Sequence, residues 1–123
     1  MQYITRFEMP QVDEVDLPRL VHDAMERADV LCEFEVVNPV TLRVRQRINR
    51  KRAATMPVTL KRKPVLISKE GYVLDGNHRW YANKVDSAPM SVIRLGLEFD
   101  DALSWLFEQP YTYKLTRTMP IRN

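Results

Sequence analysis

Residues 72–82 read YVLDGNHRWYA, and this stretch decides how the chain is organised. Its first three residues are typical of a strand, and the Asp75-Gly76 pair that follows breaks the apolar run. Asn77 is a residue type that caps helices well. The sequence therefore predicts a helix that begins at Asn77 and ends near Val85.

The first turn of this predicted helix carries His78 and Arg79, although the helix dipole disfavours positive charge there. Backbone N–H groups at a helix start bind phosphate or other anions, and a bound anion would remove the conflict. The stretch therefore predicts a phosphate site formed by Gly76, Asn77, His78 and Arg79. The alternative is structural: Arg79 pairs with an acid such as Asp75, and His78 is neutral and hydrogen-bonded.

Apolar patterns predict the elements around this turn. A hairpin of residues 65–68 and 72–74 leads into it, and a strand at residues 91–95 follows the helix. The last predicted helix starts at Asp100 or Asp101, carries Leu103, Leu106 and Phe107 inward, and ends before Pro110.

The N-terminal third predicts one clear helix. A short strand at residues 3–7 and an acidic loop at residues 11–16 precede it. Asp16 is the expected N-cap, and the apolar stripe runs to about Asp29. Its expected core residues are Leu17, Leu20, Val21, Ala24, Met25 and Ala28.

The next segment contains one strand and one ambiguous stretch. Alternation over residues 30–37 predicts a strand whose Cys32, Phe34 and Val36 face the core, so Cys32 is expected to be a small core residue. Residues 41–47 fit a strand and residues 45–55 fit a basic helix, and the pattern alone does not separate the two.

The segment 63–84, KPVLISKEGYVLDGNHRWYANK, resembles the core of the ParB/sulfiredoxin superfamily. Members show a strand, a Gly-containing hairpin, a second strand and a D-G-x-H/R-R turn into a helix. The resemblance covers residues 58–108 and implies an α+β fold, a small mixed sheet with helices packed on it.

Three branches of that superfamily imply different chemistry. Sulfiredoxins carry a reactive cysteine where this chain has Asn77, and an amide cannot act as a thiolate nucleophile. The free-serine kinase branch has D-G-H-H-R, which matches at Asp75, Gly76, His78 and Arg79 and implies that the turn binds ATP phosphates. The chromosome-partitioning branch binds CTP with a related G-E-R-R turn. The resemblance thus implies ATP or CTP with magnesium as the ligand.

A phosphate-binding turn beside a carboxylate can support nucleotide-dependent transfer or phosphodiester hydrolysis. We expect Asp75 and His78 to be the catalytic residues: Asp75 holds a metal or orients the nucleophile, and His78 donates a hydrogen bond or a proton. Arg79 would clamp a phosphate. Glu33 or Glu35 could supply a second carboxylate, one of Trp80 and Tyr81 could stack on a base, and no structural metal site is predicted.

Positive charge is concentrated in the middle of the chain. Residues 36–69 contain ten basic and no acidic side chains, whereas residues 1–35 contain nine acidic and three basic ones. Such a cluster can follow a phosphate backbone, or it can be a solvated face that pairs with the protein's own acids. The residues predicted to bind nucleic acid are Arg43, Arg45, Arg47, Arg50, Lys51, Arg52, Lys61, Arg62 and Lys63.

Length and composition predict one domain over residues 1–123, with residues 111–123 as a C-terminal extension that packs on a partner subunit or frays. The chain has no apolar run near the roughly 18 residues that span a bilayer, and no secretory pattern. A cytoplasmic location and no membrane partner are expected. The single cysteine excludes an internal disulfide and a multi-cysteine zinc site.

Three functions follow from these features. The first is a DNA-associated domain that binds nucleotide or nucleic-acid phosphate, with nuclease or NTPase activity. The second is an ATP-dependent small-molecule kinase-like enzyme on the same fold. The third is a non-catalytic interaction or inhibitor protein, which would act through a protein partner or as a homodimer.

Overall fold

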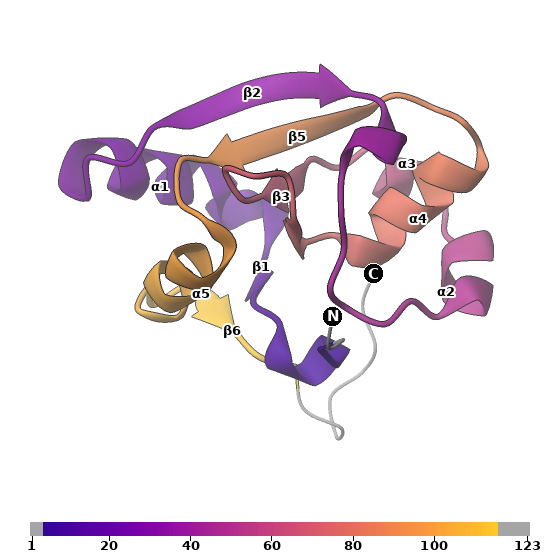
Figure 1. The fold of residues 1–123 in the computed structure, drawn as a ribbon. Helices are drawn as coiled ribbons and strands as arrows, with labels where there is room; N and C mark the ends of the chain where they lie inside the picture. Colours follow the sequence, from indigo (N-terminus) through magenta and orange to yellow (C-terminus); the bar gives the residue numbers. More distant parts are fainter. Residues whose placement is uncertain (1–3, 116–123) are drawn as a thin grey trace.

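A four-stranded mixed sheet is the centre of the computed structural model, which describes residues 4–115. The strands are β2 (Cys32–Val37), β3 (Val65–Ile67), β4 (Val73–Asp75) and β5 (Met90–Leu95), in the spatial order β2-β5-β3-β4 (Figure 1). β5 pairs antiparallel with β2 and parallel with β3, and β3 pairs antiparallel with β4. The α+β class and the mixed sheet predicted from the sequence are confirmed.

The hairpin of β3 and β4 positions the turn that follows it. Gly71 closes the hairpin with a positive φ of 93°, a conformation that glycine adopts without steric cost. Asp75 is the last residue of β4, and α4 (Asn77–Val85) begins two residues later, so the predicted helix is confirmed at both ends.

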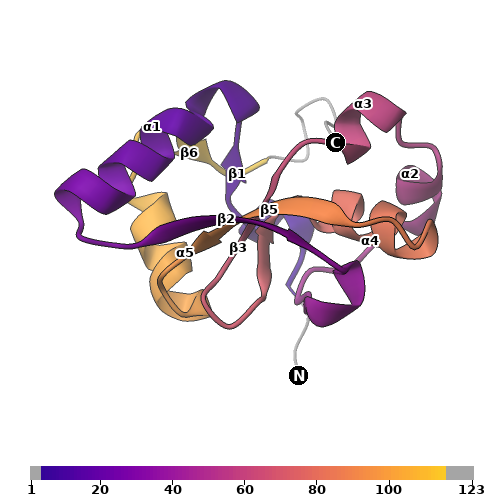
Figure 2. The same ribbon diagram turned by 90° about the horizontal axis from the view of Figure 1, so that it is seen from above.

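Helices lie at the two ends of the sheet. From above, α1 (Leu17–His22) and α5 (Phe99–Phe107) flank the strands at one end, while α2 (Arg50–Ala54), α3 (Val58–Lys61) and α4 lie at the other (Figure 2). The π-helix η3 (Asp23–Arg27) continues α1, and short 3-10 turns occur at η1 (Arg6–Glu8), η2 (Glu14–Asp16) and η4 (Pro39–Thr41). Among the described residues no helix is long and apolar enough to cross a membrane.

Three apolar clusters hold the described elements together. The largest joins Leu20 of α1, Cys32 of β2 and Leu106 of α5. The second packs Trp80 of α4 against Val65 of β3 and its neighbours, and the third lies between α2 and α4. Burial raises the pKa of the Cys32 thiol to about 11, which agrees with the expectation of a core residue and not a reactive thiol.

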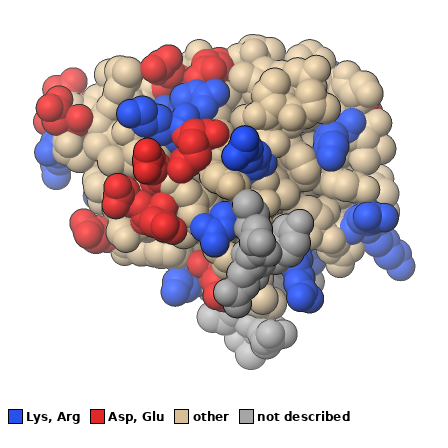
Figure 3. Space-filling view, viewed as in Figure 1, with Lys and Arg blue, Asp and Glu red and all other residues tan. Residues whose placement is uncertain are grey.

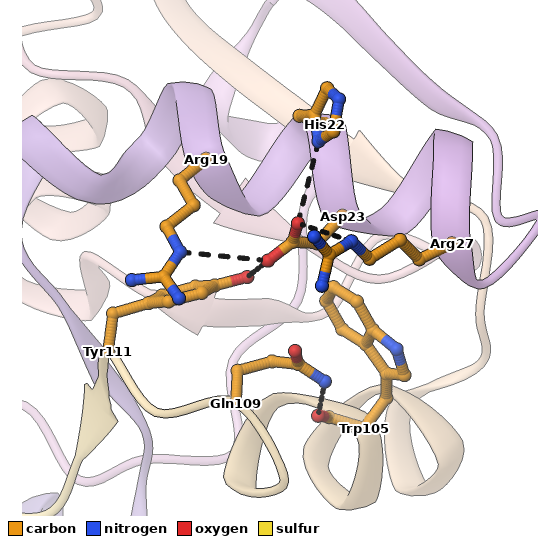
Figure 4. A network of polar contacts seen from close by, with 7 residues as sticks. All are labelled: Arg19, His22, Asp23, Arg27, Trp105, Gln109 and Tyr111. Atoms are coloured by element: carbon orange, nitrogen blue, oxygen red, sulfur yellow. Dashed lines mark hydrogen bonds and ion pairs between the residues drawn. The ribbon is translucent and has the colours of Figure 1, made fainter.

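The C-terminal residues that the structure describes are part of the fold. β6 (Thr112–Tyr113) pairs antiparallel with β1 (Gln11–Val12) in a second, two-stranded sheet. The Tyr111 hydroxyl donates to the buried Asp23 carboxylate at 3.3 Å, and Arg19 and Arg27 approach the same carboxylate at 3.9 and 3.6 Å (Figure 4). Residues 111–115 of the predicted extension therefore pack against the N-terminal part of the same chain, and residues 116–123 lie outside the described residues.

Three local predictions near the N-terminus and β2 are wrong. The described part of residues 3–7 does not form a strand. The Thr5 N–H and hydroxyl both donate to the Glu8 carboxylate, which closes the 3-10 turn η1. Phe34 and Val36 are 70% and 72% exposed. They lie on one face of an edge strand, and the apolar cluster around Leu20 includes Cys32 but neither of them.

The ambiguous basic stretch is neither a full strand nor a long helix. Arg43 and Gln46 make isolated bridges to Tyr72 and Ile4, and regular helix is confined to α2. Met25 and Phe107, expected in the core, are 43% and 36% exposed. Periodicity placed them on the apolar stripe, but they lie at its margin.

Tyr111→Phe is expected to lower the free energy of unfolding by about 1–2 kcal/mol, because it removes a buried hydrogen bond to a carboxylate. Urea unfolding of the full chain measures the change. Tyr72→Phe is the matched control, since Tyr72 bonds Ser68 through its backbone N–H and its hydroxyl makes no hydrogen bond within the described residues, and a change below about 0.5 kcal/mol is expected. Equal effects of the two substitutions would contradict a structural role for Tyr111.

Candidate functional site

Gly76, and not Asn77, is the N-cap of α4. Its φ of 102° and ψ of 28° lie in the left-handed region, which favours glycine. A Cβ at this position would lie 2.9 Å from Val65 Cγ2 and 3.0 Å from Arg79 Nη2. The prediction that Asn77 caps the helix is wrong, because a turn this tight needs glycine at the cap and moves Asn77 into the helix.

Asp75 connects three parts of the chain. Its Oδ2 accepts a hydrogen bond from the Val12 N–H at 2.9 Å, which joins β4 to β1. Its Oδ1 lies 3.8 Å from Arg79 Nη2, in an ion pair whose side chains are each 11% exposed. Asp75 therefore positions both β1 and the Arg79 guanidinium.

Arg79 is held against the turn by two partners and still has a free donor. Its Nη1 donates to the Pro64 carbonyl at 2.9 Å, and its Nη2 faces Asp75. Its Nε is buried and has no hydrogen-bond partner within the described residues. The predicted pairing of Arg79 with Asp75 is present, and a donor remains that could bind an anion.

His78 is buried and accepts a hydrogen bond. The Asn49 N–H donates to His78 Nε2 at 2.9 Å, so the ring proton of the neutral form lies on Nδ1. Burial, and then the nearby charge of Arg52, lower the pKa of His78 to about 4. At neutral pH His78 is therefore uncharged, as the structural alternative predicted, and only Nδ1–H is left to donate.

Asn77 faces a second amide that sequence reasoning missed. Its Nδ2 donates to Gln46 Oε1 at 3.1 Å, and both residues are 3% exposed. The Oδ1 atom of Asn77 is buried and has no partner among the described residues. Gln46 lies in the ambiguous basic stretch, where no pattern distinguished it from its neighbours.

The five residues from Asp75 to Arg79 line one cleft of about 340 Å³. The start of α4 forms one wall, from Asp75 to Arg79, and the segment from Gln11 to Leu17 lies across from it. Arg6, Gln46 and Lys63 also line the cleft, and Lys63 pairs with Glu14 at 3.4 Å. The predicted phosphate residues are thus brought together, and Arg6 joins them without any signal from the sequence motif.

The carboxylates of the cleft are not those expected from β2. Asp13 and Glu14 line the cleft with Asp75, whereas Glu35 pairs with Arg94 at 2.6 Å and does not line it. That hydrogen bond lowers the pKa of Glu35. No cluster of three or more His, Cys, Asp or Glu side chains that could hold a metal ion is found in residues 4–115.

The predicted nucleic-acid residues divide into two groups. Several have partners inside the protein: Arg45 with Asp100, Lys61 with Asp86, Lys63 with Glu14, and Arg43 over the Tyr72 ring. Arg52 is partly buried, and burial lowers its pKa. Four others are exposed and form no ion pair within the described residues, namely Arg47, Arg50, Lys51 and Arg62, which we call the basic surface.

Acidic side chains are unevenly distributed over the surface. Figure 3 shows most Asp and Glu on the half that carries α5, where several Lys and Arg lie among them. The half that carries α4 and α2 shows Lys, Arg and uncharged side chains. The basic surface belongs to this second half and does not line the cleft, so the two predicted binding features are spatially separate sets of residues.

His78 makes stability depend on pH. Because its pKa is lowered in the folded protein, the unfolded chain binds the extra proton between pH 6.5 and about 4. The free energy of unfolding is therefore expected to fall by about 2–3 kcal/mol on acidification across this window through His78 alone. Urea unfolding at pH 7 and pH 4.5 measures it. His78→Gln keeps an acceptor for Asn49 and should lose this part of the pH dependence; an unchanged difference would exclude His78 as its source.

Gly76→Ala is expected to lower the free energy of unfolding by about 2–4 kcal/mol, since it adds left-handed strain and a contact with Val65 and Arg79. Gly71→Ala is the matched control: its φ is also positive, but its Cβ would have no neighbour closer than 3.8 Å. We expect a loss of only about 1–2 kcal/mol there. Thermal and urea unfolding of both variants measure the difference, and equal losses would show that the close contacts at Gly76 have no cost.

Comparison with known proteins gives no family for this chain. No protein-family model matches it, and searches of curated proteins and of solved structures find no match either. The likeness to the ParB/sulfiredoxin superfamily therefore rests on the residues of the turn and on the elements around it, and it stays a prediction.

Proposed function

We propose that this protein binds a nucleotide through its phosphates in the cleft at the start of α4. One observation carries the proposal: Arg6 Nη1 and Arg79 Nε, on residues that line this cleft, are buried and have no acceptor within the described residues. Buried donors without partners cost folding free energy, and native proteins rarely keep them unless something binds them. A phosphate group supplies several strong acceptors for such donors.

The helix start adds to this preference for an anion. α4 has nine residues, and its first N–H groups carry the positive end of the helix dipole toward the Gly76 turn. Asn77, at the position of the sulfiredoxin cysteine, is buried beside this turn.

The lining of the cleft suits a nucleotide bound together with magnesium better than it suits a magnesium ion held by the protein alone. Magnesium is usually held by one or two carboxylates and by the substrate phosphates. Asp13, Glu14 and Asp75 are the carboxylates that line the cleft, and Asp75 is already engaged by Val12 and Arg79. We propose ATP or CTP with magnesium as the ligand, on a ParB/sulfiredoxin-like fold, for which the order β3, β4, α4, β5, α5 is the support.

Nucleic-acid binding is a second candidate function. It is favoured by the basic surface, whose four cations are exposed and have no acidic partner within the described residues. Electrostatic contact with a phosphate backbone needs such free cations, and its affinity falls steeply with salt. The partner would be DNA or RNA bound beside α2, away from the cleft.

Thermal unfolding with ATP, CTP, GTP and inorganic phosphate, each with and without magnesium, tests the proposal. A nucleotide that binds the folded chain raises the midpoint of thermal unfolding. At a nucleotide concentration one hundred times its Kd, the added stability is about 2.7 kcal/mol. Arg6→Ala should reduce the shift, because it removes one unpaired donor. Isothermal titration then gives the affinity of each variant.

Arg62→Ala is the control, since Arg62 is exposed and outside the cleft, and it should keep the nucleotide shift. If no nucleotide raises the midpoint, the proposal fails. Phosphate release by the same samples, compared between the wild type, Asp75→Asn and His78→Gln, tests the predicted catalytic roles of Asp75 and His78. Binding without turnover would favour the non-catalytic alternative.

A further inference from the structure

A second cleft, of about 300 Å³, lies between the three short helices at the basic end of the molecule. Its lining comes from α2, from Lys61 at the end of α3, and from the outer side of α4. None of the residues that line the α4 phosphate cleft takes part in it. It therefore needs an explanation of its own.

The walls of this cleft are apolar and carry one aromatic ring. Ala53, Ala54 and Ala82 leave the hollow because their side chains are small, and Val85, 64% exposed, lies at its rim. Tyr81 is partly buried and lines the cleft, with its ring 6.2 Å from that of Trp80. Trp80 is a core residue whose Nε1–H donates to the Pro39 carbonyl, so of the two aromatics only Tyr81 faces a cleft.

Charge at the rim selects the kind of ligand. Arg50 and Lys61 line the cleft, and Lys51 and Arg62 are their neighbours in α2 and beside α3. Of the described residues that line it, only Asp86 is acidic, and Lys61 Nζ binds its Oδ2 at 2.6 Å. Arg50, Lys51 and Arg62 form no ion pair within residues 4–115 and therefore remain as positive charge around an apolar hollow.

We propose that this cleft takes one unpaired base of a single-stranded nucleic acid, which stacks on Tyr81 while Arg50, Lys51 and Arg62 contact the flanking phosphates. Base stacking on an aromatic side chain combined with basic residues along the backbone is how single strands are bound without sequence preference. The proposal rests on the second candidate function, nucleic-acid binding, and adds its site and its preference for single strands.

A duplex does not fit the same chemistry. Its bases are paired and stacked on one another, so none can enter a cleft without being flipped out at a cost of a few kcal/mol. The duplex would use the basic surface alone. An acidic peptide with an apolar side chain is the competing ligand, and the experiment below separates the two.

Fluorescence anisotropy with a labelled oligo(dT) at low salt measures the affinity, and an abasic oligonucleotide of equal length keeps the phosphates without the bases. We expect the abasic strand and the matching duplex to bind about five- to one-hundred-fold more weakly than oligo(dT), the range expected for loss of one stacked base. Tyr81→Leu should lose the same factor on oligo(dT), and Tyr81→Phe, which keeps the ring, should not.

A matched pair of exposed valines tests the location without touching the core. Val85→Glu places an acid at the rim of the cleft, whereas Val58→Glu makes the same change on α3 at similar exposure, 59% against 64%, outside the lining. Val85→Glu should weaken oligo(dT) binding several-fold more than Val58→Glu. This pair stays informative if Tyr81→Leu fails to fold.

The outcomes separate the two levels of the proposal. If no oligonucleotide binds at low salt, nucleic-acid binding itself fails. If oligo(dT), the abasic strand and the duplex bind equally, or both valine variants act equally, the protein binds phosphate backbones without this cleft and the inference is overturned. Stronger binding of an acidic peptide than of oligo(dT) would overturn it as well.

Discussion

The buried carboxylate of Asp75 is the interaction on which the rest of the structure depends. One oxygen binds the Val12 N–H and so attaches the two-stranded sheet to the main sheet, and the other faces the Arg79 guanidinium at the start of α4. A buried charge is tolerated only with such partners, because an unpaired one costs several kcal/mol. The same contacts give the cleft its two walls, so fold and candidate site share one anchor.

Much of the sheet and of the site helix could be predicted from local pattern. The β3–β4 hairpin and β5 have apolar runs bounded by Gly or Pro, and α4 follows the Asp75-Gly76 break. Each lies close to its predicted residues. The predictions that failed depend on contacts between segments far apart in the chain. Phe34 and Val36 alternate as core residues do, but no pattern reveals that β2 is an edge strand and that these two side chains are left exposed. β1 and β6, two residues each, exist only because distant segments meet.

The candidate site shows the same division. Gly76 to Arg79 are contiguous, so their grouping in one cleft needed only the turn and the helix. Arg6, Gln46 and Glu14 come from segments far away in the chain, and their approach depends on β1 and on the irregular stretch before α2. The sequence shows where the basic residues lie along the chain, but it does not show which of them form ion pairs with distant acids. In the structure Arg45, Lys61 and Lys63 do so, and the four residues of the basic surface do not within the described residues.

The uncovered part of β2 has a consequence for the behaviour of the chain in solution. Its outer edge presents unpaired backbone groups, Phe34 and Val36 lie bare on one face, and the charge of Glu35 on the other face is neutralised by Arg94. Lysine, proline or a bulge often protects such an edge, whereas this strand has only the exposed charge of Glu33 besides the paired Glu35. We therefore expect β2 to be the strand through which molecules associate edge to edge when a solution of the chain is concentrated.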